Sequence, residues 1–300
     1  MAGSEPSPPL YCKSYGDDIR RFVRLQESVA RFNRDGLKFY VSVPARDHAL
    51  FASHVDRDAV ELIDDEDIVR ANARADLGRY TSWHGRLSQQ VVKSEFWRLV
   101  PCDSYVCLDS DCLFLKDFRR SDFLHPDGHP YTVLHEGKDF LQLAASKGME
   151  KVLHGFSEGS RRMKERFGRT GPDYDFGPIP VVWSARVWRD LDERMLAPAG
   201  MTLWDAIERE PSEFRWYGES LLKFGSIPLH PIEPLFRCYH YDWQWHALRA
   251  TGETHETLKR HFLGVVYQSN WQYELDSGAQ VKSLPSRLLR RVKRRLARFR

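Results

Sequence analysis

Two aspartates that stand one residue apart, Asp109 and Asp111, carry the clearest chemical signal in the sequence. They follow an apolar run over residues 105–108 and precede a second one over 112–115. In open α/β sheets, ligands bind beyond the carboxyl ends of the strands. Carboxylates at such a place can hold Mg²⁺ or Mn²⁺, hard ions that prefer oxygen ligands and often share them with phosphates. The alternative is a strand-end turn with two solvated aspartates, which the apolar flanks on both sides disfavour.

The sequence around this pair alternates between strand and helix patterns, which is typical of a layered α/β domain with right-handed crossovers. In the first half we expect strands over residues 10–14, 37–43, 68–69 and 105–108, and helices from Asp17 or Asp18 to Gly36, from near Asp47, and over 88–99. In the second half we expect strands over 179–183 and 262–267, with Ser184 capping the helix that follows the first of them.

The composition is that of a folded globular protein. Of the 300 residues, 42% are hydrophobic and 29% charged, which excludes a disordered or collagen-like chain. The five cysteines form no C-x-x-C pair, so we expect free thiols rather than a disulfide framework or a zinc ribbon. The first ten residues lack the apolar segment of a secretory signal, and we expect a cytoplasmic protein.

The net charge of +3 depends on the end of the chain, because residues 287–300 carry eight basic residues and no acidic one. The rest is mildly acidic, which argues against a specific nucleic-acid partner. Apolar residues recur at helical spacing between the basic ones, so we expect a domain over 9–282 and a basic amphipathic helix over 283–300. Residues 286–300 of this helix can bind an anionic membrane surface at the cytoplasmic face. A frayed basic tail with nonspecific RNA contacts is the alternative.

The sequence around the aspartate pair resembles the GT-A glycosyltransferases, whose signature is an Asp-x-Asp motif after an apolar strand. Over residues 9–275 it resembles a group of bacterial glycosyltransferase-like proteins, the DUF6492 type. The motifs that carry the resemblance are Lys13-Ser14-Tyr15, Phe39-Tyr-Val-Ser-Val-Pro44, Gln89-Gln90-x-x-Lys93, Pro180-Val-Val-Trp183-Ser184, Trp216-Tyr217-Gly218-Glu219 and the run from Phe262 to Trp271. The resemblance implies a GT-A fold, three-layer α/β/α with a mostly parallel central sheet. It also implies a hexosyltransferase-like enzyme that moves a sugar from a nucleotide-sugar donor to a hydroxyl of a cell-surface glycan or lipid-linked saccharide.

The resemblance further implies roles for individual residues. Asp111 would ligate the Mn²⁺ or Mg²⁺ that bridges the donor diphosphate, and Asp109 would share the metal or contact the ribose. Glu219 would take the proton from the acceptor hydroxyl. Two histidines compete as a third metal ligand: His240, which we prefer, and His261. The residues expected to contact the nucleotide sugar are Asp109, Lys13, Ser14, Tyr15, Lys93 and Ser110.

Several of these assignments leave alternatives open. Lys93 fits a surface lysine of an amphipathic helix equally well, and Glu219 fits an acidic residue at a helix N-terminus. The late tryptophans either fill a core or form an acceptor wall; they are Trp183, Trp216, Trp243, Trp245 and Trp271. The alternative functions are a catalytically silent nucleotide- or glycan-binding module of the same fold and a nucleotide-sugar nucleotidylyltransferase. Residues 13–18 lack the Gly-rich phosphate loop of the latter.

Overall fold

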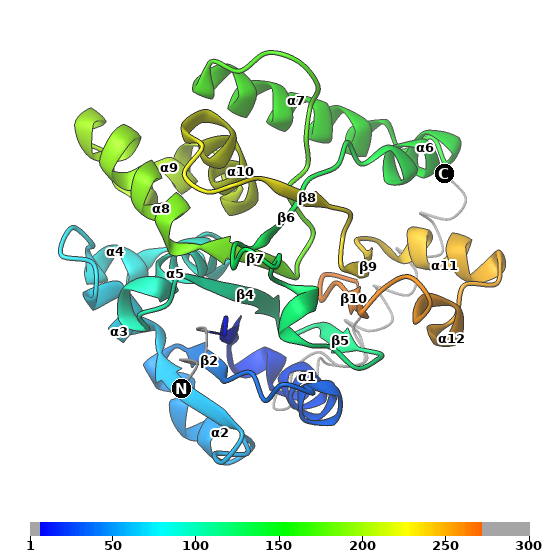
Figure 1. Ribbon diagram of the computed structural model, residues 1–300, viewed down its shortest axis with the longest axis horizontal. Coiled ribbons are helices and arrows are strands. Elements are labelled where there is room, and N and C mark those ends of the chain that lie inside the picture. The colour runs from blue at the N-terminus through cyan, green and yellow to red at the C-terminus, as the bar shows by residue number, and fades with distance from the viewer. Residues whose placement is uncertain (1–6, 272–300) are drawn as a thin grey trace, which may run out of the picture.

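A five-stranded sheet forms the centre of the computed structural model, which describes residues 7–271 (Figure 1). The strand order is β3-β2-β1-β4-β7; the first four strands are parallel, and β7 runs antiparallel to β4. The strands are β1 (Leu10–Lys13), β2 (Phe39–Val43), β3 (Val60–Asp64), β4 (Ser104–Asp109) and β7 (Val181–Ser184). The mostly parallel α/β sheet is therefore confirmed.

Helices cover both faces of this sheet. The register places Tyr11, Tyr40 and Tyr105 on one face, where all three rings contact Phe96 of α5 (Gly85–Leu99). The opposite face carries Phe39, whose ring contacts Phe22 of α1 (Ile19–Phe32). Because side chains alternate across a strand, the apolar runs of β1, β2 and β4 bury both faces, and the three-layer arrangement follows.

The third strand is not where the sequence pattern placed it. Ile68 and Val69 lie buried in a helix, α3 (Asp65–Arg70), and the strand is β3. Three acidic residues in the first turn of α3 favour the helix, because they complement its N-terminal dipole. The apolar pair then packs against α5. The other elements of the first half are α2 (His48–Ala52), α4 (Leu77–Ser82) and the short 3₁₀ turns η1 (Gly16–Asp18) and η2 (Ala45–Asp47).

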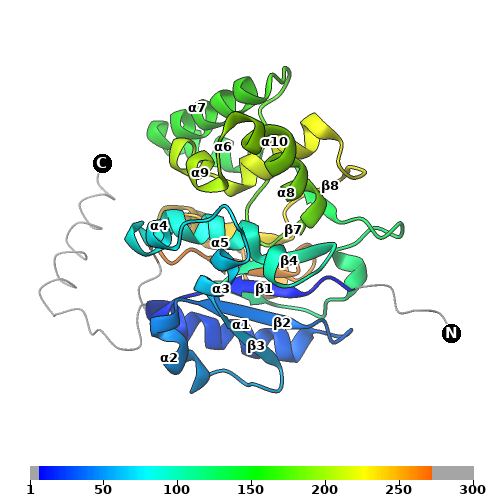
Figure 2. The same ribbon diagram turned by 90° about the vertical axis from the view of Figure 1, so that its left-hand side faces the viewer.

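The second half adds two small sheets and a group of helices. The sheet β5-β10-β9 pairs β10 antiparallel with β5 and parallel with β9, while β6 and β8 form a parallel pair. Figure 2 shows α6, α7, α9 and α10 on the side of the central sheet opposite α1 and α2. The strands are β5 (Cys112–Phe114), β6 (Tyr131–Val133), β8 (His230–Ile232), β9 (Phe236–Tyr239) and β10 (Gly264–Tyr267). The helices are α6 (Lys138–Ser146), α7 (Glu150–Phe167), α8 (Ala185–Leu191), α9 (Leu203–Arg209), α10 (Glu213–Phe224), α11 (Asp242–Ala250) and α12 (His255–Leu258), with short turns η3 (Arg120–Asp122), η4 (Asp192–Leu196) and η5 (Ala197–Ala199).

Two further expectations concern the ends and the thiols. The predicted amphipathic helix over 283–300 and the end of the predicted domain 9–282 lie outside the described residues. Between residues 7 and 271, no helix combines the length and apolar character needed to cross a bilayer. All five cysteines are free thiols, as expected.

Candidate active site at the carboxyl edge of the central sheet

The aspartate pair lies where β1 and β4 end side by side. Helix α1 follows β1 and covers one face of the sheet. Helix α5 precedes β4 and covers the other face. Such a reversal is a topological switch point, the usual ligand-binding place of open α/β sheets. Lys13 pairs in register with Asp109, and the Ser110 hydroxyl donates to Ser14 Oγ at 2.7 Å. The structure therefore brings together residues that the sequence separates by 96 positions.

Asp111 has an unusual environment for a carboxylate. Its Oδ2 accepts a hydrogen bond from the Ser269 backbone N–H at 2.9 Å, while its Oδ1 is shielded from water and has no hydrogen-bond partner among the described residues. Burial and the neighbouring charge of Asp109 raise the pKa of Asp111 to about 8. A divalent cation would satisfy the unpaired oxygen and offset the repulsion between the two acids. The two aspartates thus fit a Mn²⁺ or Mg²⁺ ion.

This pKa predicts how metal binding depends on pH. The folded-state pKa of Asp111 lies above the unfolded value of about 3.9. The metal-free fold therefore retains this proton and loses stability as pH rises from about 4 to about 8. Below pH 8 a metal must displace the proton, so we expect Mn²⁺ affinity to fall about tenfold between pH 7 and pH 6. Titration calorimetry in buffers of different ionisation enthalpy checks this, and binding with no proton release at pH 6–7 would contradict it.

Lys93 forms the centre of a buried charge network beside the pair. Its Nζ lies 3.3 Å from Asp109 Oδ1 and 2.8 Å from Glu213 Oε1. Burial disfavours the ammonium, but the two carboxylates outweigh it and raise the pKa of Lys93 well above its usual range. The lysine is thus a buried cation rather than a surface residue, whereas Asp109 keeps 38% of its side chain exposed. Sequence reasoning missed Glu213, which the N-cap residue Ser212 marks as the first residue of α10.

The residues expected to bind the nucleotide differ in how exposed they are and in which side chains hold them. Lys13 Nζ is held by Asp65 Oδ2 at 3.1 Å, and Tyr80 donates to the same carboxylate oxygen at 2.9 Å. Ser14 is buried, but the ring of Tyr15 is 41% exposed and lies beside the Lys13 ammonium. Tyr15 is therefore the most exposed residue of this strand end.

Of the two histidines, only His240 lies near the aspartates. It follows β9, whose neighbour β10 ends at Tyr267, and the Tyr267 N–H donates to the Asp111 carbonyl at 3.3 Å. His261 is exposed and precedes the other end of β10. Within the described part of the chain, His240 does not join both aspartates in a cluster of ligand atoms within 4.8 Å. Its imidazole instead contacts the Cys238 thiol, with Nδ1 3.6 Å from Sγ.

A third carboxylate, that of Asp175, lies close to Cys238 at the site. Burial, followed by the charges of Asp111, Asp109 and Asp175, raises the pKa of its thiol well above the usual range. Asp175 lies in the loop before β7, where its Oδ1 accepts from the Gly177 N–H at 3.1 Å, and its charge also reaches His240. Sequence reasoning missed it, although Asp173 and Asp175 are the two acidic residues of the Gly- and Pro-rich segment 168–180.

Glu219 is held in a buried ion pair with Arg169. Its two carboxylate oxygens accept from the Arg169 guanidinium, each at 2.7 Å, and its side chain is 3% exposed. It lies in the middle of α10, so the N-terminal helix position considered from the sequence does not apply. The residues before Glu219 are held by contacts within the fold. The Tyr217 hydroxyl accepts a hydrogen bond from the Ser184 N–H, and the Phe176 ring lies so close to Gly218 that a Cβ there would have no room.

Substitution of Glu219 is therefore expected to affect stability. Glu219→Gln leaves the Arg169 cation without its carboxylate, which should cost about 3 kcal/mol of unfolding free energy. Urea unfolding measures this loss, with Arg161→Gln on the exposed face of α7 as the control for removing an ion pair. Nucleotide affinity of the folded variant should match that of the parent. An unchanged unfolding free energy together with lost activity would instead support the role first expected of Glu219.

The late tryptophans differ in their surroundings, and Trp245 and Trp271 pack against a small second core. Trp183 and Trp216 are fully buried and belong to the core. Trp243 instead stacks with Tyr241 at 5.5 Å, and both rings lie parallel to Phe140, each at 6.3 Å. Phe140 also contacts His240. These three half-buried rings, hereafter the aromatic stack, lie on the Asp175 and His240 side of the site.

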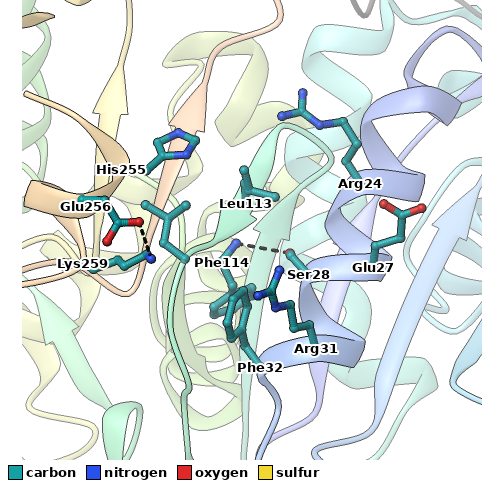
Figure 3. A pocket seen from close by; sticks show the side chains of 11 residues that line it. Arg24, Glu27, Ser28, Arg31, Phe32, Leu113, Phe114, His255, Glu256 and Lys259 are labelled. Carbon is teal, nitrogen blue, oxygen red and sulfur yellow. Dashed lines mark hydrogen bonds and ion pairs between the residues drawn. The ribbon is translucent and has the colours of Figure 1, made fainter.

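A groove lined by basic and acidic side chains lies between α1 and α12. Figure 3 shows it between α1, which supplies Arg24 and Arg31, and α12, which supplies His255. Its volume is about 340 Å³. Arg24 also lines the small hollow at Asp111. Burial and the charge of Arg24 lower the pKa of His255.

Residues 9–276 match the family model described as "Family of unknown function (DUF6492)", and the chain belongs to this family. It is the family that the sequence motifs resemble. A comparison with curated proteins found no match in sequence.

The chain is also similar to solved structures of glycosyltransferases. One is the galactosyltransferase LgtC in complex with donor and acceptor sugar analogs, at 13% identity over 86% of each chain and a TM-score of 0.44. Another is mouse xyloside xylosyltransferase 1 in its apo form, at 11% identity over 88% of this chain and 98% of that chain, with a TM-score of 0.47. A third is the bifunctional glycosyltransferase WbbM, at 12% identity over 89% of this chain and 46% of that chain, with a TM-score of 0.45.

Proposed function

We propose that the protein is a metal-dependent glycosyltransferase that binds a nucleotide-sugar donor at the switch point between β1 and β4. The observation that carries this proposal is the unpartnered, water-shielded Oδ1 of Asp111 next to Asp109. A buried acceptor without a partner is costly, and a divalent cation shared with a diphosphate would satisfy it. The cation, when bound, neutralises the charge that develops on the departing nucleoside diphosphate.

On the donor side, the residues around the aspartate pair would have different roles. Asp111 and Asp109 would hold the cation, and Lys93, which pairs with Glu213 and Asp109, would contact a phosphate oxygen. Tyr15, exposed at the end of β1, is placed to stack on the base or ribose. His240 becomes a third ligand only if its side chain turns from Cys238 toward the pair.

On the acceptor side, we assign the proton to Asp175 rather than Glu219, because Asp175 is half-exposed and close to Cys238 and His240. The acceptor oxygen forms a bond to the anomeric carbon, and the bond from that carbon to the diphosphate oxygen breaks with its electron pair. The hydroxyl proton passes to the Asp175 carboxylate. The aromatic stack would hold the apolar face of the acceptor sugar, as in a glycan or a lipid-linked saccharide.

A catalytically silent nucleotide-binding module is the second candidate. It is favoured by Lys93, which already neutralises part of the Asp109 charge without a metal. Such a module would bind a nucleoside diphosphate and turn over no donor.

One experiment separates the two. Nucleoside diphosphates and nucleotide sugars are screened by thermal shift with and without Mn²⁺, since a ligand that binds the native state raises its melting temperature. Each donor that stabilises the protein is then assayed for hydrolysis and for transfer to glycans. A Mn²⁺-dependent shift with turnover supports the transferase, a shift without turnover on any donor or acceptor supports the silent module, and no shift contradicts both.

A further inference from the structure

Two histidines and an aspartate converge at a place that the proposed transfer does not use. His125 and Asp127 belong to the turn before β6, and His230 is the first residue of β8. Because β6 and β8 are parallel, this cluster lies at their starts. His135, which follows β6, bonds to the Asp175 segment. The cluster and the candidate active site are therefore at opposite ends of this strand pair.

The atoms of this cluster are spaced as metal ligands are. Asp127 Oδ2 lies 2.8 Å from His230 Nε2, and Asp127 Oδ1 lies 3.1 Å from His125 Nδ1. The two imidazole rings stack with centroids 3.7 Å apart, so both nitrogens point at one carboxylate. Around a tetrahedral ion with bonds of about 2.0–2.1 Å, neighbouring ligand atoms are about 3.3 Å apart. Because a metal–nitrogen bond lies in the plane of the imidazole, the two stacked rings would tilt apart as an ion binds between their nitrogens and the carboxylate.

The turn holds two of the three ligands in place before any ion arrives. The His125 N–H donates to the His129 carbonyl and the Gly128 N–H to the His125 carbonyl, both at 2.9 Å. The His129 N–H donates to Asp127 Oδ1, also at 2.9 Å. Gly128 has a φ of +87°, a conformation that favours glycine.

Two imidazole nitrogens and one carboxylate oxygen form a donor set for Zn²⁺ rather than for Mg²⁺ or Mn²⁺, which prefer oxygen ligands alone. Asp127 is exposed and borders a groove of about 830 Å³, from which water can reach a fourth position. We propose that His125, Asp127 and His230 form a second metal site, which binds Zn²⁺ with water as the fourth ligand.

The position of this site indicates a structural role. Asp127 and His230 are 103 positions apart in the sequence. An ion held by both would tie the starts of β6 and β8 together and close the segment between them, which includes β7 and α10. Since Zn²⁺ would bind the folded chain and find no such site in the unfolded one, it should raise the melting temperature.

The test uses the full chain without a histidine tag, stripped of metal and titrated with Zn²⁺ by calorimetry. His125→Gln and His230→Gln remove one ligand each from different elements, and glutamine retains a donor toward Asp127. His154→Gln, an exposed histidine of α7, is the matched control. Asp111→Asn removes the acidic pair as an alternative Zn²⁺ site. Circular dichroism and the metal-free melting temperature establish that each variant is folded.

We expect one equivalent of Zn²⁺ to bind the parent, His154→Gln and Asp111→Asn, and to raise their melting temperatures. In His125→Gln and His230→Gln, the affinity should fall at least tenfold, and Zn²⁺ should no longer raise the melting temperature. Unchanged Zn²⁺ affinity in both of these variants would overturn the proposal. Loss of Zn²⁺ binding in Asp111→Asn alone would do so too, because it would place the ion at the aspartate pair.

Discussion

Asp111→Asn is expected to abolish Mn²⁺-dependent nucleotide binding and to lower sugar transfer by about 10³-fold, because a cation that offsets leaving-group charge is worth several kcal/mol. The substitution keeps the shape of the side chain and removes its charge. It also removes the repulsion with Asp109, so the metal-free variant should be more stable than the parent at pH 8. Calorimetry with Mn²⁺ and a nucleoside diphosphate measures the first effect, and thermal unfolding at pH 8 the second.

The matched control is Asp117→Asn, an exposed aspartate that follows β5 and pairs with Arg34. It should bind metal and nucleotide as the parent does. If Asp111→Asn also retained the parent's Mn²⁺-dependent affinity, the assignment of Asp111 as a metal ligand would be incorrect.

Asp175→Asn should lower kcat by about 10³-fold, within the range that a positioned general base contributes. Asparagine still offers an oxygen to the Gly177 N–H, so the loop before β7 should retain its conformation. Metal and nucleotide affinity should remain within a factor of about two, since Asp175 is placed on the acceptor side. Steady-state kinetics measures kcat and KM separately.

Asp173→Asn provides the control on the same loop, because Asp173 pairs with Lys164 rather than facing the site. A kcat for Asp175→Asn within threefold of the parent would exclude Asp175 as the proton acceptor. That result would direct attention to Glu213, the other acidic residue near Asp109.

The sequence predicts the first half of the fold well, because its signals are local. The apolar runs before Pro44 and before Asp109 correspond to β2 and β4, and the aspartate pair lies at the strand edge where the pattern placed it. Ile68 and Val69 were assigned wrongly to a strand, since a buried apolar pair fits a helix equally well.

The candidate site is harder to predict, because its members meet only in the folded chain. Asp175 is recognised through its effect on Cys238, which lies more than sixty positions further on. For Glu219, the sequence pattern and the surroundings in the fold differ. Its aromatic neighbours suggest a site from the sequence, whereas in the fold they are core residues of α10 and the acid pairs with Arg169. Spacing alone cannot distinguish a buried ion pair from a catalytic acid.

The most direct measurement is the anomalous diffraction of Mn²⁺ in crystals grown with a nucleoside diphosphate. We predict a peak within bonding distance of Asp111 Oδ1, shared with the phosphates and close to Asp109. Nucleotide bound between β1 and β4 with no manganese at the two aspartates, and with Asp111 still paired only to the Ser269 N–H, would contradict the account.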